Sequence, residues 1–316
     1  MLFIKKYCFQ LLFMALLVLP WVQAQGQQKA EDLFKEDYFY LDGLEQKILN
    51  AAKAQKGKTI SQFQIENKGL VDDKPVSIPI QAPKKADRYP SATLFENHKK
   101  AVLILGRLNQ ANPDFAPLAE SLATAFFISQ DGVAVTNYHV LGEMIHSNKS
   151  IDSLMLSQDS SMYYVQNYDG DVFTIEKIMA YSASNDLAIF KVNIGNKRIE
   201  YLDLDEPIPV GEKVNVISHP EQNFYFMTEG IVAKNSKLVN PENPKQKQWR
   251  MTITADYSVG SSGGPILNAY GKVAGVVSST SNIYGSKTEK TPLQMVVKNG
   301  ISVIAINELL KKGKNE

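Results

Sequence analysis

Cysteine is almost absent from this sequence. The single cysteine, Cys8, lies near the N-terminus of a chain of 316 residues, so no second cysteine exists to form a disulfide within it. A chain of this length can bury a core large enough to fold without disulfides. The absence also excludes a cysteine nucleophile or a thiolate metal site in the rest of the chain.

An excess of charge of one sign is also missing. The sequence has 34 Lys and Arg against 33 Asp and Glu, a formal net charge of +1, and only 4 His. A basic patch is the usual mark of a nucleic-acid-binding protein, and we predict no such partner here. No histidines or carboxylates are spaced as metal ligands usually are, so we predict no metal and no other cofactor.

The longest apolar run lies at the N-terminus and is short. Residues 11–19 are apolar, follow Lys5 and Lys6 and precede Pro20, whereas a membrane-spanning helix needs about 20 residues. Together with the small-x-small pattern that ends at Ala24, this predicts a signal peptide over residues 1–24 and a secreted or periplasmic protein. We expect contact with a membrane only if this segment is retained.

Residues 25–91 differ in composition from the residues C-terminal to them. Apolar residues between Leu33 and Leu49 are interrupted by Gly43 and predict one or two amphipathic helical segments. The stretch from Val71 to Ala92 has four prolines and mixed charges, as linkers do. Such a helical extension fits a propeptide, a regulatory arm or a segment packed on the main domain, and composition does not choose between them.

From residue 92 to residue 316 the pattern is that of an all-β domain. About a dozen short runs rich in Val, Ile, Phe and Tyr are separated by turns such as Asp131-Gly132 and Tyr270-Gly271. This predicts a barrel or sandwich rather than a parallel α/β sheet. One predicted strand covers residues 301–306, and residues 305–313 are predicted to form a short closing helix.

Three residues in this region could work together. His139 ends the run "GVAVTNYH", Asp186 precedes the apolar strand "LAIFKV", and Ser262 lies in "GSSGGPILN". The pentapeptide at 260–264 also fits the nucleophile elbow of α/β-hydrolases, but in that fold the histidine follows the serine. The last histidine here, His219, precedes both serines, which excludes the elbow.

The order His139, Asp186, Ser262 and the motifs "VTNYHV", "NDLAIFKV", "GSSGGPILN" and "GKVAGVVSS" resemble those of chymotrypsin- and trypsin-like serine peptidases. "VISHPEQNFYFMTEGIVAK" resembles the disulfide-free bacterial members, including the protease domain of high-temperature-requirement proteases. The resemblance implies two six-stranded antiparallel Greek-key barrels and a serine endopeptidase that acts on polypeptides. Only a short helix comes after the predicted barrels, so we expect no PDZ module.

The resemblance also assigns roles to residues. Ser262 is the nucleophile, His139 its general base and Asp186 the group that orients the histidine. The backbone N–H groups of Gly260 and Ser262 form the oxyanion hole, which stabilises the negatively charged oxygen of the intermediate.

The resemblance bears on four further positions. Asp256, six residues before Ser262, stands where an acid selects Arg or Lys substrates, although a solvated turn aspartate fits as well. Ser278 and Thr280 align with the wall that binds the substrate strand. Ser261 replaces the acid that activates the digestive relatives.

The alternative function is a catalytically silent protein of the same fold that binds peptides.

Overall fold

The computed structural model describes residues 34–36, 38–79, 87–110, 114–146, 160–244, 246–285 and 292–311. Of the described residues, those before Gly43 belong to one unit and those from Gly43 onward belong to a second, compact unit. Every helix and strand described here belongs to the second unit. The predicted signal peptide, residues 1–24, lies outside the described residues.

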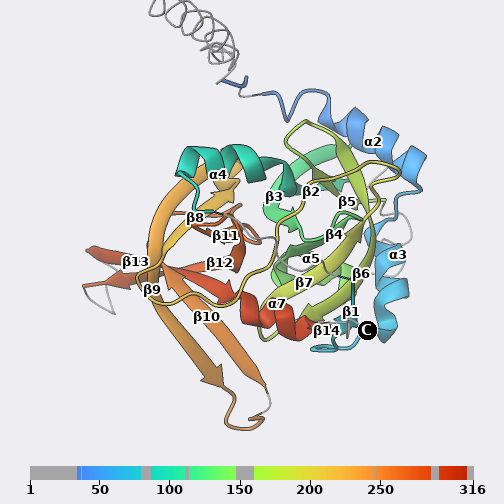
Figure 1. Cartoon of the computed structure of the whole chain (residues 1–316). Helices are drawn as coiled ribbons and strands as arrows, with labels where there is room; N and C mark the ends of the chain where they lie inside the picture. Colours follow the sequence, from blue (N-terminus) through green and yellow to red (C-terminus); the bar gives the residue numbers. More distant parts are fainter. Residues whose placement is uncertain are drawn as a thin grey trace, which may run out of the picture. The chain divides into compact units, whose positions relative to one another are not determined.

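The N-terminal barrel contains six antiparallel strands (Figure 1). They are β2 (Val102–Asn109), β3 (Leu118–Phe127), β4 (Val133–Thr136), β5 (Met162–Gln166), β6 (Val172–Ser182) and β7 (Leu187–Val192), and they close in the order β2-β3-β4-β7-β6-β5. Side chains such as Leu105, Phe127 and Phe190 fill its core. Alternation of inward and outward residues along each strand brings these apolar side chains to the inside.

The C-terminal barrel has the same strand number and the same antiparallel pairing. Its strands are β8 (Lys213–Ser218), β9 (Phe226–Val239), β10 (Lys247–Ile253), β11 (Pro265–Asn268), β12 (Val273–Tyr284) and β13 (Leu293–Ser302), closed in the order β10-β13-β12-β11-β8-β9. Val216, Met251 and Ile266 lie in its core. The fold prediction of two six-stranded antiparallel barrels is confirmed.

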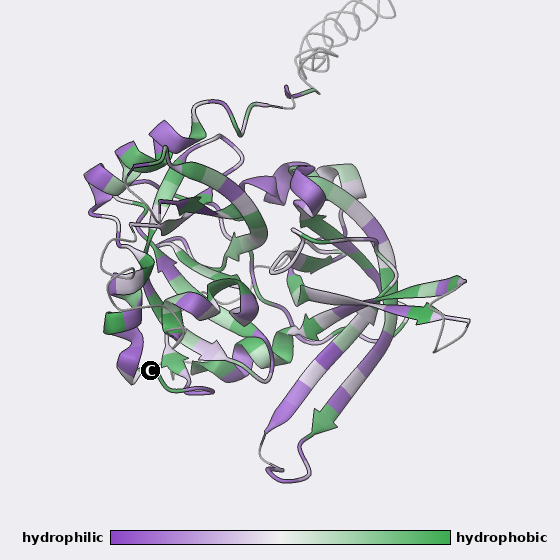
Figure 2. Cartoon of the chain, turned by 180° about the vertical axis from the view of Figure 1, so that it is seen from behind, coloured by the Kyte–Doolittle hydropathy of each residue, from purple (hydrophilic) through white to green (hydrophobic). Residues whose placement is uncertain are grey.

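Strands β9 and β10 continue beyond the barrel as a long hairpin. Their register pairs Val239 with Lys247 at the outer end and Val232 with Ile253 at the barrel. Figure 2 shows the projecting part as largely hydrophilic, and most β9 side chains there are exposed. A hydrophilic two-stranded ribbon cannot bury an apolar core by itself. The apolar side chains of the hairpin pack at its barrel end, where Val232, Met251 and Ile253 lie in the core.

The segment before the barrels forms helices that pack on the N-terminal barrel. Helix α2 (Leu44–Gln55) and helix α3 (Ile60–Glu66) confirm the predicted helical extension. A capping box between Thr59 and Gln62 starts α3, and Phe63 enters the barrel core. A short 3₁₀ turn follows at Asn67–Gly69. Whether residues 25–91 are removed stays a prediction.

Shorter elements connect and close the structure. Helix α4 (Ser91–His98) and a 3₁₀ turn (Lys99–Ala101) lead into β2, and another 3₁₀ turn (Pro220–Gln222) follows β8. Strand β1 (Val76–Ser77) pairs in parallel with β14 (Leu310–Lys311). No helix in the described ranges is both long and apolar enough to cross a membrane.

Two local predictions were wrong. The predicted strand over residues 301–306 ends at Ser302, whose hydroxyl accepts a hydrogen bond from the Ile304 N–H and starts the closing helix α7 (Val303–Leu309). His139 does not end a strand, because β4 stops at Thr136 and His139 lies in the first turn of α5 (Tyr138–Ile145). The short apolar runs were compatible with either element, and local hydrogen bonding decided between them.

Candidate active site

His139 and Asp186 lie in direct contact. The His139 ring Nδ1 is 3.0 Å from both carboxylate oxygens of Asp186, and the His139 backbone N–H donates to Asp186 Oδ1 at 3.0 Å. The His139 ring lies at the start of α5, which packs on the core of the N-terminal barrel, and the Asp186 carboxylate lies just before β7 of that barrel. A carboxylate so placed holds the proton on Nδ1 and leaves Nε2 free to accept another.

Asp186 occupies a strained turn that the C-terminal barrel supports. Its φ is 58°, a left-handed conformation that Asp tolerates better than most residues. The Arg250 guanidinium donates to the carbonyls of Ser184 (2.9 Å) and Asn185 (3.2 Å). The Asn185 amide accepts from the Trp249 N–H and donates to the Lys247 carbonyl. Strand β10 therefore fixes the turn that presents the acid.

Ser262 joins this pair through Ser278. The Ser278 hydroxyl donates to Asp186 Oδ2 at 2.9 Å, and the Ser278 carbonyl accepts from the Ser262 hydroxyl at 3.3 Å. The Thr124 N–H donates to the Ser262 carbonyl at 2.9 Å. The nucleophile turn of one barrel thus lies against β3 of the other. Among the described residues, the hydrogen bond of the Ser262 hydroxyl goes to Ser278 rather than to the His139 ring.

The two predicted oxyanion donors are available. In the part of the chain that the structure describes, neither the Gly260 N–H nor the Ser262 N–H donates a hydrogen bond to the protein. Gly260 has a φ of 91°, and a Cβ there would lie 2.4 Å from the His219 carbonyl oxygen. Only glycine fits this position. Two unsatisfied N–H groups beside a serine hydroxyl are the arrangement that binds an oxyanion.

The predicted substrate-binding residues lie in different environments. Asp256 is exposed, with 80% of its side chain accessible, and forms an ion pair with Lys298 at 2.5 Å. The Lys298 ammonium holds the pKa of the Asp256 carboxyl below its usual value. Thr280 is exposed on β12, and Ser278 faces Asp186 as well as Ser262.

Sequence reasoning missed three contributors to the site. Thr124, Ser218 and Lys298 were not singled out, and the donation from Ser278 to Asp186 was not foreseen. Thr124 was recognisable as a polar residue inside the apolar strand run "ATAFF", where a buried hydroxyl must find hydrogen-bond partners. Ser218 and Lys298 become meaningful only when distant strands are placed side by side.

His219 is buried beside the nucleophile turn, and its ring is predicted to weaken the fold in acid. Burial lowers the pKa of the His219 imidazole to about 3, and its Nδ1 accepts from the Tyr225 N–H at 2.9 Å. Between pH 6.5 and pH 3 the unfolded chain binds a proton that the folded chain refuses, so stability falls as the pH falls. The slope is at most about 1.4 kcal/mol per pH unit.

Urea unfolding at several pH values tests this expectation. His219→Asn keeps an acceptor for the Tyr225 N–H and removes the titrating ring. The variant should lose stability less steeply than the wild type between pH 6.5 and pH 3. Parallel slopes for the two proteins would contradict the assignment.

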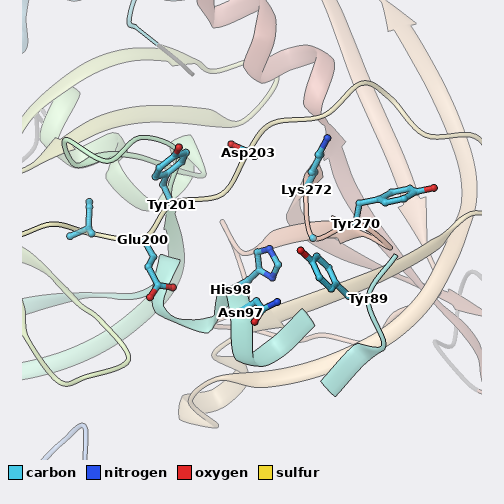
Figure 3. A pocket seen from close by; sticks show the side chains of 10 residues that line it. Tyr89, Asn97, His98, Glu200, Tyr201, Asp203, Tyr270 and Lys272 are labelled. Atoms are coloured by element: carbon cyan, nitrogen blue, oxygen red, sulfur yellow. The ribbon is translucent and has the colours of Figure 1, made fainter. Parts of the chain in front are cut away.

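A further cavity has a volume of about 420 Å³, and Figure 3 shows the side chains that line it. Its wall combines helix α4, the segment between the barrels and the turn between β11 and β12. The lining residues are Tyr89, Asn97, His98, Ile199, Glu200, Tyr201, Asp203, Tyr270, Gly271 and Lys272. The His98 Nδ1 lies 2.8 Å from the Leu94 carbonyl in its own helix. None of the predicted catalytic residues lines this cavity.

No metal site emerges from the described ranges. No group of three or more His, Cys, Asp or Glu among those residues is arranged to hold an ion. The groups that the site itself presents are a hydroxyl, an imidazole, a carboxylate and backbone donors.

Two antiparallel barrels, with a histidine and an acid on one and a serine turn on the other, define a chymotrypsin-like fold. Residues 123–276 match the family model described as the trypsin-like peptidase domain. This range contains His139, Asp186 and Ser262. Residues 123–276 are therefore similar to trypsin-like peptidase domains, and the predicted resemblance is confirmed.

Curated relatives place the chain near the Do-like proteases. It is 26% identical over 170 residues to "Protease Do-like 5, chloroplastic" of Arabidopsis thaliana, covering 53% of this chain and 50% of the relative. It is 29% identical over 197 residues to a "Probable periplasmic serine endoprotease DegP-like" of Pseudomonas putida (strain GB-1), covering 62% and 36%. The chain thus spans half of the first relative and about a third of the second.

The solved structure of an "HtrA-type protease AlgW with decapeptide" has the same fold. The TM-score is 0.51 at 18% identity, with 70% of this chain and 66% of the other covered. At this identity the likeness supports the fold alone.

Proposed function

We propose that the protein is a serine endopeptidase that cleaves polypeptides through an acyl-enzyme formed on Ser262. The main support is a series of contacts: the His139 ring contacts Asp186, the Ser278 hydroxyl donates to Asp186, and the Ser262 hydroxyl donates to the Ser278 carbonyl. Among the described residues, the N–H groups of Gly260 and Ser262 beside them donate no hydrogen bond to the protein. A serine hydroxyl is a weak nucleophile at neutral pH unless a base removes its proton. In the proposed mechanism His139 is that base, and Asp186 orients it.

Each residue has a defined part in the proposed reaction. When substrate binds, the Ser262 hydroxyl leaves the Ser278 carbonyl and gives its proton to His139 Nε2 as its oxygen attacks the scissile carbonyl. Asp186 stabilises the imidazolium that forms. The N–H groups of Gly260 and Ser262 bind the oxyanion. His139 then gives the proton to the leaving amine, and water releases the acyl group by the same steps.

We also propose that the protein is exported. The support is the N-terminal pattern of Lys5, Lys6 and the apolar residues 11–19. The name of the Pseudomonas putida relative describes that protein as periplasmic. Export with cleavage after Ala24 gives a mature chain with two fewer lysines near its start.

Hydrolysis of an unfolded protein tests the function. Purified protein is incubated with reduced, unfolded casein, and new peptide termini are identified by mass spectrometry. Internal cleavages that require Ser262 support an endopeptidase. A folded protein that binds casein without producing new termini would support the silent peptide-binding alternative, for which the Ser262–Ser278 bond is the favouring observation.

The pairing of Lys298 with Asp256 predicts the choice of substrate. Lys298 is 13% exposed and its ammonium contacts both Asp256 and the Tyr257 carbonyl. Because this internal cation already occupies the carboxylate, we expect little preference for cleavage after Arg or Lys. Lys298→Met should raise the ratio of kcat/KM for an Arg substrate to kcat/KM for the matching Ala substrate by about 5-fold. This corresponds to a free-energy difference of roughly 1 kcal/mol.

Matched variants isolate the charge. Lys298→Arg keeps the cation and should leave the Arg-to-Ala ratio as in the wild type. Adding Asp256→Asn to Lys298→Met should remove the gain. An unchanged ratio in Lys298→Met would show that Asp256 does not face the substrate.

A further inference from the structure

The oxyanion loop, residues Val259 to Ser262, lacks the acid that orders the equivalent turn in the digestive relatives. Ser261 stands at that position, and its side chain is buried. Ser261 cannot form an ion pair with an N-terminal amine. The loop nevertheless presents two unengaged N–H groups among the described residues, so other contacts must set its conformation.

The first contact fixes the peptide between Val259 and Gly260. The Glu221 N–H donates to the Val259 carbonyl at 2.8 Å. In a trans peptide the N–H points opposite to the carbonyl, so the Gly260 N–H is turned away from Glu221. Glu221 has a φ of 46° and Gln222 a φ of 63°. Such strain persists only where surrounding contacts enforce it.

The second contact fixes the next peptide. The Thr124 hydroxyl donates to the Gly260 carbonyl at 2.8 Å and accepts from the His219 N–H at 3.2 Å. The same residue donates its N–H to the Ser262 carbonyl at 2.9 Å. Thr124 is fully buried on β3. One residue of the N-terminal barrel therefore connects the Gly260 and Ser262 carbonyls of the oxyanion loop to the backbone of His219, which follows β8.

The third contact involves Ser261, which stands where the digestive relatives have an acid. The Ser218 hydroxyl donates to the Ser261 hydroxyl at 3.0 Å, and both side chains are buried. The Ser261 N–H donates to the Ser258 carbonyl, and the Ser261 carbonyl accepts from the Gly264 N–H. The buried groups of Ser261 are thus bonded within the protein. A buried hydroxyl left without a partner would be costly, which favours this arrangement.

We propose that Thr124, assisted by the Ser218–Ser261 hydroxyl pair, is the positioning residue that keeps the oxyanion hole formed without an activating ion pair. This inference rests on the proposed peptidase function. It makes the hole a property of the folded barrels, independent of processing at the N-terminus. Thr124 touches no reacting atom and acts through Gly260 and Ser262.

Labelling with a fluorophosphonate probe tests the proposal, because the phosphoryl oxygen of the adduct must enter the oxyanion hole. Thr124→Val keeps the shape of the side chain and removes the hydroxyl. We expect its labelling rate and kcat for a peptide amide to fall about 10- to 100-fold, with KM little changed. Thr124→Ser restores the hydroxyl and should recover most of the rate.

A matched control separates this effect from the general loss of a buried threonine. Thr174→Val also removes a buried hydroxyl, one on β6 that is bonded to the Gln55 side chain of α2 at 3.0 Å. It should label as fast as the wild type. If Thr124→Val does not fold, Ser218→Ala removes the hydroxyl that bonds Ser261 in the same oxyanion loop and should slow labelling several-fold.

Crystal structures keep this inference distinct from the function itself. In Thr124→Val we expect the Gly260 carbonyl to rotate away from β3, and in Thr124→Ser to keep its place. Wild-type labelling with equal rates in Thr124→Val would overturn the positioning role. If the wild type does not label, the proposed function fails, and an unchanged loop in the Thr124→Val crystal would overturn this inference separately.

Discussion

Replacing Ser262 by alanine is expected to reduce kcat for peptide hydrolysis by about 10⁴- to 10⁶-fold, because the change removes the hydroxyl proposed to form the acyl-enzyme. The Ser262 side chain is partly exposed, and its hydroxyl donates to the carbonyl of Ser278, whose own hydroxyl donates to Asp186. The residual rate would come from the oxyanion donors and substrate binding. Initial rates with an internally quenched peptide measure the change.

The neighbouring serine supplies the comparison. Ser261 is fully buried and bonded to Ser218, so its hydroxyl cannot reach a substrate carbonyl. Ser261→Ala should still form an acyl-enzyme, at a rate reduced only by the looser oxyanion loop. If Ser261→Ala were inactive and Ser262→Ala active, the assignment of the nucleophile would be reversed.

Asp186→Asn should lower kcat by about 10⁴-fold while the fold remains intact. Asp186 accepts from the His139 ring, the His139 N–H and the Ser278 hydroxyl. An amide nitrogen in its place would donate to Nδ1 and move the ring proton to Nε2. The ring would then face Ser262 with a proton and could not act as its base.

Nitrogen-15 NMR of the His139 ring reports the tautomer directly and separates this cause from simple misfolding. Asp131→Asn is the matched control, since Asp131 pairs with Lys191 at 2.7 Å in a turn of the same barrel and has no part in the site. It should leave kcat unchanged. Activity of Asp186→Asn within about 10-fold of the wild type would remove Asp186 from the proposed mechanism.

The barrels could be predicted because their signal is local and repeated. Short apolar runs between turns such as Asp131-Gly132 predict β-strands, and the resemblance to trypsin-like peptidases implies that these strands close into two barrels. The errors fell where one short run suits two elements. Ser302 turned the last expected strand into α7, and the helix α5 began before His139 was reached.

The candidate site was predictable only in part. His139, Asp186, Ser262 and Gly260 lie in short motifs that resemble those of trypsin-like peptidases, and the resemblance assigns their roles. Thr124, Ser218 and Lys298 act across pairs of strands that are distant in sequence, so their partners depend on register. The Asp256 carboxylate illustrates the limit, because its counter-ion lies far along the chain on β13.

The central claim is that Ser262 is an activated nucleophile, and adduct mapping on the unmodified protein tests it most directly. Folded wild-type protein is treated with a fluorophosphonate. Its intact mass is then measured by mass spectrometry, and the protein is digested for peptide mapping. We predict a single adduct on Ser262. A folded protein that carries no adduct, or carries it on Ser261, would contradict the account.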